Sequence, residues 1–313
     1  MKKSLLALAA IALMSTTAHA EKIGVSIALL EHNFLAVMAK GMTTYAKTVP
    51  GLELQVEDAN NDVAKQLSQV QNFIASGVDA IIVNAVDTSA TQAMTDAAAA
   101  AKIPLVYVNR QPINVDTLPD GQAFVASNEV DSGTLETKEI CRLLKAKGKT
   151  AATAVVLVGE LSNQAAVQRT KDVHDVIASP ECSFIKIVEE QTANWNRAQG
   201  QDMMTNWVSK GDKFDAVISN NDEMAIGAIQ ALKASSVARD SYIIGGVDAT
   251  QDALIAMQAG DLDVTIFQDA AGQGKGSIDT ALKIKKGEKV DKKVYIPFQL
   301  VTPANIKDFL TKN

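Results

Sequence analysis

Cysteine and histidine are scarce in this sequence of 313 residues, which has two Cys and three His. Cys141 and Cys182 do not have the CxxC spacing of a redox motif. A structural zinc site takes four ligands, most of them Cys or His, so the sequence predicts no metal site and no cofactor. No serine or cysteine stands in a pattern that pairs it with a histidine base, so we also expect a protein that is not an enzyme.

Long apolar segments and an excess of positive charge are also absent. Beyond the first 20 residues, no run approaches the ~18 apolar residues that a membrane-spanning helix needs. The 36 Asp and Glu outnumber the 30 Lys and Arg, the formal net charge is −6, and no basic stripe occurs. These features predict no nucleic-acid partner and no insertion into a membrane.

Residues 1–20 have the three parts of a secretory signal peptide. Lys2 and Lys3 are positive, Leu5–Met14 is a short apolar run, and the Ala-His-Ala at 18–20 has the small residues of a cleavage site. An N-terminal membrane anchor is the alternative, but the apolar run is too short to span a bilayer. We therefore expect an exported, periplasmic protein whose mature chain begins near Glu21.

Export also determines what the two cysteines are expected to do. Exported proteins fold in oxidising compartments, where pairs of cysteines form disulfides. The sequence therefore predicts a disulfide between Cys141 and Cys182. Two separate buried thiols are the alternative.

Strand-like and helix-like segments alternate along the mature chain. The first array of expected strands is Ile23–Leu29, Leu52–Glu57, Ala80–Val83 and Pro104–Val108. The second array is Ala123–Ala126, Ala154–Val158, Phe184–Glu189, Phe214–Ser219, Tyr242–Val247, Val264–Phe267 and Val294–Val301. Amphipathic helices are expected between the strands, among them Leu135–Lys145. This alternation predicts an α/β protein with two doubly wound, mostly parallel sheets, one in each of two lobes.

Polar residues gather directly after the expected strands, where open parallel sheets bind their ligands. They include Asn109 and Arg110 in the first array and Asp248 in the second, with Phe34 and Trp195 as aromatic companions. Amides, carboxylates and guanidinium groups pair well with neighbouring hydroxyls, and two aromatic rings can cover both faces of a saturated ring. The pattern predicts a sugar or cyclitol site, and turn or helix-cap roles are the alternative.

Several segments resemble the periplasmic ribose- and galactose-type binding proteins, which are the receptors of ABC-type sugar importers. These segments are residues 23–42, 58–62, 108–111, 219–225, 246–248 and 267–268. The resemblance covers essentially the whole chain, and Asn220–Gly227 is its most specific part. Residues 109–112 and 246–252 look most like the subgroup that binds inositol and rhizopine, an inosamine.

The resemblance implies a type I periplasmic binding protein fold, in which two lobes joined by a three-segment hinge close on the ligand. The crossings are expected near Ala126–Asn128, Val264–Gln268 and Phe298–Val301. The N-terminal lobe would contain residues 21–126 and 268–298, and the C-terminal lobe residues 127–267 and 299–313. The implied function is that of a monomer that delivers a sugar or cyclitol to an ABC transporter permease in the inner membrane.

The resemblance also implies roles for residues at the strand ends. Phe34 and Trp195 match the stacking aromatics, and Arg110 matches an arginine that contacts ring hydroxyls. The other matched polar positions are Asn109, Asn221, Asp248 and Gln268. His32 and Asn33 complete the expected set, with His32 lining or gating the cleft.

Three positions depart from the family's pattern. Asn33 replaces a proline of ribose receptors and Val247 replaces an aromatic residue, which favours a ligand with a six-membered ring over ribose. An inositol or inosamine is the expected ligand, and a hexose is the next alternative. Val167 stands where many relatives have a ligand-binding arginine. Arg169 is two residues further on, and a helix turns about 100° per residue. We therefore expect one charged ligand contact to be missing.

Three other functions fit parts of the sequence. An exported enzyme on the same fold would need an acid–base pair, and Asp222 with Glu223 is a candidate. Adjacent residues of a helix point in different directions, so these two side chains are not expected to act on one substrate atom. Asp222 is expected instead to cap the helix that follows. A sugar-responsive repressor shares the two-lobe core but needs a DNA-binding segment and a basic face. A chemotaxis or signal receptor of the same fold stays open as an alternative.

Overall fold

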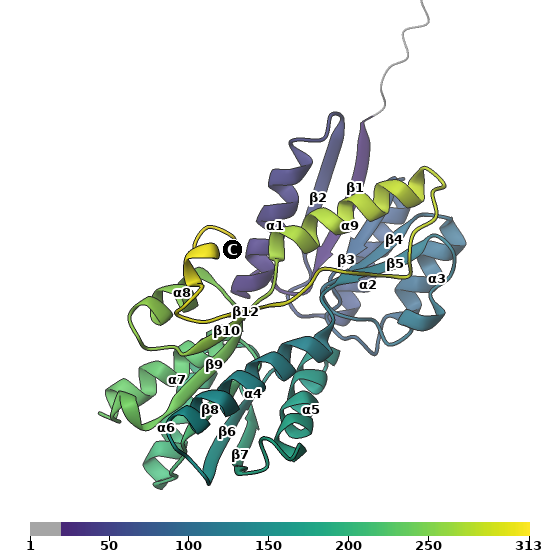
Figure 1. Cartoon of the computed structure of the whole chain (residues 1–313). Helices are drawn as coiled ribbons and strands as arrows, with labels where there is room; N and C mark the ends of the chain where they lie inside the picture. The colour runs from purple at the N-terminus through teal and green to yellow at the C-terminus, as the bar shows by residue number, and fades with distance from the viewer. Residues whose placement is uncertain (1–19) are drawn as a thin grey trace, which may run out of the picture.

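The computed structural model describes residues 20–313. The predicted signal peptide, apart from Ala20, lies outside the described residues. The chain from Ala20 onward forms two lobes, each built around one six-stranded sheet with helices on both sides (Figure 1). This arrangement confirms the predicted α/β class with two doubly wound lobes.

In the first lobe, every strand of the sheet runs parallel to its neighbours. The strand order is β11 (Lys293–Tyr295), β5 (Gln122–Ala126), β4 (Leu105–Val108), β3 (Ala80–Val83), β1 (Glu21–Ile27) and β2 (Leu52–Asp58). Its helices are α1 (Asn33–Ala46), α2 (Val63–Ala75), α3 (Gln92–Ala101) and α9 (Ala270–Lys285). Met38 of α1 and Ile278 of α9 share one core cluster, and Phe73 of α2 and Met94 of α3 share another, so these helix pairs cover opposite faces of the sheet.

In the second lobe, the sheet is parallel except for β12, which is antiparallel to β10. The strand order is β12 (Gln299–Val301), β10 (Val264–Phe267), β9 (Ile243–Asp248), β8 (Ala216–Ser219), β6 (Ala152–Val158) and β7 (Ile185–Thr192). Its helices are α4 (Glu129–Ala146), α5 (Gln164–Ala178), α6 (Arg197–Lys210), α7 (Asp222–Ala234) and α8 (Gln251–Gln258). A single hydrophobic cluster from Ile140 to Phe309 forms its core. Short 3-10 helices cover Val115–Thr117, Arg239–Ser241 and Ile306–Asp308.

The central strands show why the sequence forms parallel sheets. β3 and β4 are apolar at every position and buried throughout, as expected for strands that helices cover on both faces. In β1, Gly24 lets α2 pack closely, because a Cβ atom there would lie 2.4 Å from the ring of Phe73. The buried strands hold their carboxyl ends, and the loops that follow them, in fixed positions.

The chain passes between the sheets three times: between β5 and α4, between β10 and α9, and between β11 and β12. The prediction of one strand over Val294–Val301 is wrong. Its first part pairs with β5 in the first lobe, and its last part pairs with β10 in the second lobe. Pro297 lies between the two parts and has no N–H to donate to a sheet, so the strand is interrupted there.

Helix α4 begins six residues before its predicted start at Leu135. The first turns bury polar side chains instead of apolar ones, and the hydroxyl of Ser132 donates to the carboxylate of Glu129 at 3.1 Å. The regular spacing of apolar residues, from which the helix was predicted, therefore begins only after the first turns of α4. Further along α4, Cys141 is joined by a disulfide to Cys182, with 5.8 Å between their Cα atoms.

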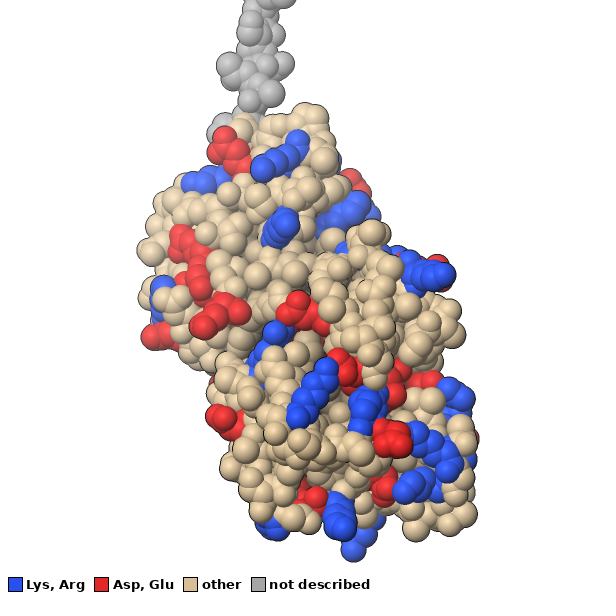
Figure 2. Space-filling model, turned by 90° about the vertical axis from the view of Figure 1, so that its left-hand side faces the viewer, with Lys and Arg blue, Asp and Glu red and all other residues tan. Residues whose placement is uncertain are grey.

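The surface carries charges of both signs. On the face shown in Figure 2, Lys and Arg are interspersed with Asp and Glu over both lobes. Within residues 20–313, no helix is both long enough and apolar enough to cross a membrane.

Candidate functional site

All nine residues predicted from the strand ends line one small cavity between the lobes. The complete lining is His32, Asn33, Phe34, Leu35, Asn109, Arg110, Asn163, Ala165, Arg169, Trp195, Asn221, Glu223, Asp248 and Gln268. The cavity has a volume of about 50 Å³. Since one water needs roughly 10–15 Å³ by this measure, the cavity suits a small molecule and not a polymer.

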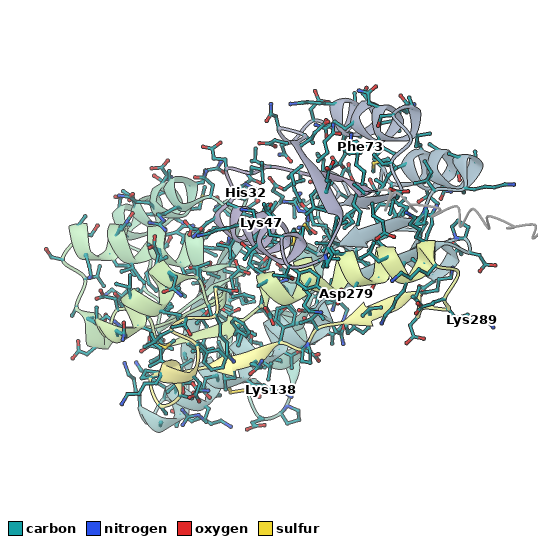
Figure 3. The ribbon with its side chains drawn as sticks, turned by 90° about the horizontal axis from the view of Figure 1, so that it is seen from above. His32, Lys47, Phe73, Lys138, Asp279 and Lys289 are labelled. Atoms are coloured by element: carbon teal, nitrogen blue, oxygen red, sulfur yellow. A yellow bond between two sulfur atoms is a disulfide. The ribbon has the colours of Figure 1, made fainter. Side chains whose placement is uncertain are left out.

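The lining residues come from the carboxyl ends of strands in both lobes, where a doubly wound fold binds ligands. In the first lobe, the segment His32–Phe34 follows β1, and Asn109 and Arg110 follow β4. From the sheet of the second lobe, Trp195 follows β7, Asn221 follows β8, Asp248 is the last residue of β9, and Gln268 follows β10. Figure 3 labels His32 where the two lobes meet.

Three of these residues hold unusual backbone conformations. Asn109, Trp195 and Asp248 have φ angles of 65°, 61° and 119°. Positive φ costs an L residue about 1–3 kcal/mol and persists only where the surrounding structure holds it. The strand ends are therefore shaped to aim these side chains at the cavity, at some cost in folding free energy.

The ring of Trp195 packs directly on the backbone of Gly159. A Cβ atom on Gly159 would lie 2.2 Å from the ring, so only glycine fits at this position. The guanidinium of Arg169 lies 5.5 Å from the ring centre, in the range of a cation–π contact. The buried Nε1 of Trp195 has no hydrogen-bond partner among the described residues.

Arg169 lines the cavity, so the expectation that a charged ligand contact is missing is wrong. Val167 is 54% exposed, whereas Arg169 is buried on the opposite side of α5. Its Nε donates to Glu129 at 2.7 Å, and its NH2 donates to Oε1 of Gln268 at 3.1 Å. Val167 and Arg169 thus lie on different sides of α5, as a turn of about 100° per residue implies, and Arg169 is the one that reaches the cavity.

Arg110 joins the two lobes through a buried ion pair. Its NH2 lies 3.1 Å from Oε2 of Glu160 in the second lobe, and the two side chains are 3% and 10% exposed. Its NH1 donates to the backbone carbonyls of Ala85 and Val86, at 3.2 Å each. Asn61 of the first lobe also donates to Glu160, at 3.2 Å. The guanidinium is thus held rigidly at the cavity wall.

Asp248 presents a carboxylate to the cavity with little support from the protein. Its Oδ1 lies 3.9 Å from NH1 of Arg169, and no hydrogen bond joins the carboxylate to another described residue. Burial raises the pKa of this carboxyl well above its ordinary value, and the nearby carboxylate of Asp222 raises it further, while Arg169 opposes the shift. A hydroxyl or ammonium group of a ligand would supply the missing donor.

Asn221, which lines the cavity, also takes the helix-capping role that was expected of its neighbour Asp222. Asn221 caps α7, since its Oδ1 accepts from the N–H of Met224 at 3.0 Å. The prediction that Asp222 caps this helix is therefore wrong. Asp222 is buried in the second lobe, where it accepts from the N–H of Thr250 at 2.9 Å and from the hydroxyl of Thr265 at 2.7 Å.

The remaining predicted residues have mixed environments. Gln268 accepts from Arg169 through Oε1, while its buried Nε2 has no partner among the described residues. The amide of Asn109 bonds to Asn84 and to Gln273 at 3.2 Å each, which fixes its orientation. Burial lowers the pKa of His32, with a smaller opposing effect from Glu160, so this imidazole is held neutral at the cavity wall.

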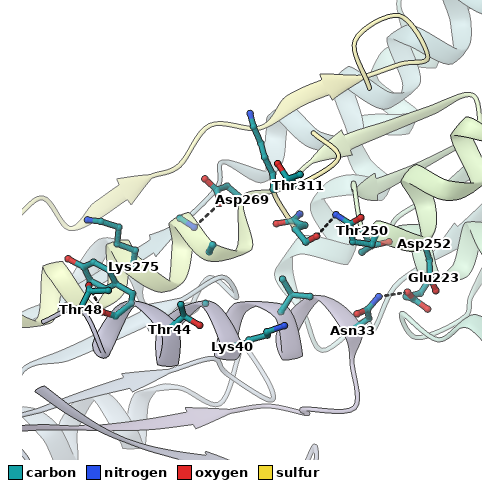
Figure 4. Close-up of a pocket in the computed structure, with 18 of the residues that line it drawn as sticks. Asn33, Lys40, Thr44, Thr48, Glu223, Thr250, Asp252, Asp269, Lys275 and Thr311 are labelled. Carbon is teal, nitrogen blue, oxygen red and sulfur yellow. Dashed lines mark hydrogen bonds between the residues drawn. The ribbon is translucent and has the colours of Figure 1, made fainter. Parts of the chain in front are cut away.

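A larger groove lies next to the cavity on the side of α1, α8 and α9 (Figure 4). Its volume is about 1110 Å³, and its lining includes Lys40, Lys275 and Asp269. Asn33 and Glu223 line both the groove and the small cavity, so this pair forms part of the wall between them. The groove contains one of the nine predicted residues and is distinct from the predicted site.

Within residues 20–313, no group of three or more His, Cys, Asp or Glu side chains is arranged to hold a metal ion. The acids near the cavity are instead paired with arginines or buried singly. Glu129 pairs with Arg169, and Glu160 pairs with Arg110. The chemistry of the lining is therefore that of hydrogen bonding and ring packing.

The fold and the cavity together define a two-lobe protein that holds a small molecule between its lobes. Residues 23–289 match the family described as periplasmic binding protein domain, and the chain belongs to this family. It is 65% identical, over the full length of both chains, to a protein of Rhizobium meliloti named "Putative rhizopine-binding protein".

Solved structures of this kind are also similar. An ABC transporter solute binding protein from Bacillus halodurans C-125 with bound myo-inositol has a TM-score of 0.87 and 39% identity, over 96% of this chain and all of the other. A Caulobacter myo-inositol binding protein bound to myo-inositol has a TM-score of 0.83 and 27% identity, over 93% and 96%.

Sequence reasoning left three polar lining residues out of the predicted set. Asn163 and Glu223 follow strands β6 and β8 and are among the polar residues found after the expected strands, but the resemblance gave them no ligand-binding role. Arg169 lies within α5, away from any strand end. Its signal was the helical period, because Ala166, Arg169 and Val173 share one buried face.

Proposed function

We propose that this protein is the periplasmic substrate-binding protein of an ABC-type importer and that it traps a small cyclitol in the cavity between its lobes. The observation that carries the proposal is a small cavity between the lobes whose lining has unpaired polar groups. Among the described residues, Trp195 Nε1 and Gln268 Nε2 are donors without partners, and the Asp248 carboxylate is an acceptor without a donor. Buried polar groups need partners, and a ring with many hydroxyls supplies both kinds.

The charges of the lining select against anionic ligands. Arg110 and Arg169 are the cations of the cavity, and each is already paired with a glutamate behind it. Glu223 and Asp248 add two carboxyl groups to the lining itself, and Glu223 is paired with Arg197. A sugar phosphate or sugar acid would therefore find no unpaired cation in the lining, whereas a neutral polyol or an amino-cyclitol needs none.

The proposed ligand is myo-inositol or a related inosamine. The names of the relatives support this choice, since rhizopine and myo-inositol occur among them. Phe34 and Trp195 would cover the faces of the ring, and Arg110, Asn109, Asn221, Asp248 and Gln268 would contact its polar substituents, with His32 and Asn33 at the rim. An ammonium group would be placed against Asp248.

Several further features belong to this proposal. Residues 1–20 would be removed on export to the periplasm, and the protein would act as a monomer that passes its ligand to a membrane permease without changing it. The lobes would comprise residues 21–126 with 268–298 and residues 127–267 with 299–313. The three crossings would serve as the hinge on which the lobes close.

A binding screen tests the proposal. Mature protein, unfolded and refolded to remove any carried-over ligand, is titrated with myo-inositol, scyllo-inositol, an inosamine, galactose and ribose. A ligand that binds only the folded state stabilises it by about 2.7 kcal/mol at 100 times its Kd, which raises the Tm. Inositol hexakisphosphate and glucuronate serve as the anionic controls.

We expect a clear rise in Tm with an inositol or the inosamine and none with the two anions. A rise with galactose or ribose alone would keep the receptor function and overturn the ligand. Binding of either anion as tight as that of the inositols would contradict the charge argument. Consumption of any ligand during the assay, measured by chromatography, would show an enzyme instead of a receptor.

A further inference from the structure

One hydrogen bond joins the two lobes at the wall between the cavity and the groove. The Nδ2 of Asn33 donates to Oε1 of Glu223 at 2.9 Å (Figure 4). Asn33 is the first residue of α1 in the first lobe, and Glu223 is in the first turn of α7 in the second lobe. Because both side chains line the cavity and the groove, separating them would open the cavity toward the groove.

Arg197 of α6 holds the carboxylate of Glu223 in position. Its Nε donates to Oε2 at 2.8 Å and its NH2 donates to Oε1 at 3.1 Å, which is the two-point geometry of a strong Arg–carboxylate pair. The NH2 also donates to Asp252 at 2.6 Å, so Arg197 is itself fixed. Arg197 lines the groove but not the cavity, so it acts on the cavity through Glu223.

The backbone also favours a carboxylate at this place. Glu223 lies at the N-terminus of its own helix α7, and its partner Asn33 lies at the N-terminus of α1. Helix N-termini carry partial positive charge, so closure brings a second such end up to the Glu223 carboxylate. Opening the lobes would remove both the Asn33 hydrogen bond and this second dipole.

We propose that Glu223 and Arg197 are positioning residues of a latch, formed by Asn33, Glu223 and Arg197, that sets the closed fraction of the protein before ligand binds. The inference rests on the proposed function, because closure matters only for a protein that traps its ligand between lobes. Both partners in each hydrogen bond of the latch are groups of the protein itself, so the latch favours the closed form whether or not ligand is bound. A smaller closed fraction raises the apparent Kd in proportion.

The other side of the cavity has a related contact, in which Asn61 and Arg110 of the first lobe bind Glu160 of the second. Arg110 lines the cavity, so its substitution would change ligand contacts and closure together. Arg197 offers the cleaner test, because the lining of the cavity does not include it.

The test measures the distance between the lobes without ligand. Spin labels are attached to Lys47→Cys on the first lobe and Lys138→Cys on the second, both of which are exposed (Figure 3). Cys141 and Cys182 are paired with each other, so only the introduced cysteines react. Distance distributions from double electron–electron resonance are compared between the labelled parent, Arg197→Met and Arg142→Met.

We expect Arg197→Met to shift the ligand-free distribution away from the closed distance, and Arg197→Lys to shift it less in the same direction. Arg142→Met is the matched control, since Arg142 forms a similar two-point pair with Glu139, at 2.8 and 2.7 Å, wholly within α4. It should leave the distribution unchanged. We expect the Kd for myo-inositol to rise about tenfold in Arg197→Met, which corresponds to about 1.4 kcal/mol, and to stay unchanged in Arg142→Met.

A ligand-free distribution in Arg197→Met that equals the parent's would overturn the latch, whatever the affinities are. A shift of the same size in Arg142→Met would also overturn it, because the effect would then be a general one. If the parent binds no myo-inositol, the proposed ligand is wrong, and the ligand-free distances still decide about the latch. Arg197→Lys carries the test if Arg197→Met does not fold, as judged by circular dichroism.

Discussion

Replacing Gly159 with alanine should weaken ligand binding although Gly159 is not itself a residue of the cavity lining. The new Cβ would lie 2.2 Å from the ring of Trp195, and ordinary contacts begin at 3.4 Å, so the ring has to move by roughly 1.2 Å. Gly159 itself follows β6, a buried strand that cannot retreat. The movement therefore falls on Trp195 and, through its cation–π contact, on Arg169.

The size of the effect follows from what the ring contributes. Apolar surface of the ligand covered by the ring contributes about 25 cal/mol per Å², so uncovering about 50 Å² would raise the Kd up to about tenfold. Crowding a packed site should also lower the free energy of unfolding by about 1–3 kcal/mol. Isothermal titration with myo-inositol measures the first quantity, and urea denaturation without ligand measures the second.

The matched control is Gly24→Ala, whose Cβ would lie 2.4 Å from the ring of Phe73 in the core of the first lobe. It creates a similar clash with an aromatic ring, far from the cavity lining. We expect it to lower stability and to leave the Kd within about twofold of the parent. If Gly159→Ala folds and binds myo-inositol as tightly as the parent, Trp195 does not pack on the ligand and the reasoning is refuted.

Three more predictions follow from buried groups. Burial raises the pKa of Glu136 from 4.5 to about 8. The contribution of this carboxyl group to stability is therefore complete below about pH 4.5 and is lost as the pH rises to about 8. Glu136→Gln should reduce the fall in Tm that the parent shows between pH 5 and pH 8. Asp248→Asn should weaken an inosamine more than myo-inositol in parallel titrations, and equal losses would mean that Asp248 does not face the amine. Unfolded, unreduced protein should show no free thiol, because Cys141 and Cys182 are bonded to each other. The double variant Cys141→Ser/Cys182→Ser should have a free energy of unfolding lower by about 4 kcal/mol, as expected for a sequence separation of 41. Guanidinium denaturation measures this difference.

The parts of the fold that depend on local pattern were predictable from the sequence. The buried runs at Ala80–Val83 and Val264–Phe267 are strands with the predicted bounds, because continuous apolar segments of that length fit a doubly covered sheet. Elements with polar interiors were harder to place. The first turns of α4 bury Glu129 and Glu136. Charged residues at buried positions interrupt the regular spacing of apolar residues by which a helix is predicted from sequence.

Most residues of the cavity lining were predictable for a related reason. Each predicted residue is positioned by the end of its own strand. The polar residues at each strand end can therefore be identified separately, without knowing how the two lobes are arranged. Arg169 does not follow this rule, because it reaches the cavity from the second turn of α5. Its burial depends on Glu129, which is 40 positions away in the sequence. The spacing of apolar residues within α5 shows which face of the helix is buried. It does not show that Glu129 pairs with the buried Arg169 and so offsets the cost of burying its charge.

Contacts across the cavity wall depend on the placement of one lobe against the other, which no local pattern encodes. Asn33 and Glu223 are 190 positions apart, and each has a satisfactory local explanation as the beginning of a helix. Only their meeting gives them a second role, and Arg197 supports that role from the groove side of the wall. Most of the cavity lining is therefore encoded locally at strand ends, whereas the contact between the lobes at this wall is encoded in a pair of distant residues. The two properties can change separately, since substituting Arg197 leaves every residue of the cavity lining in place.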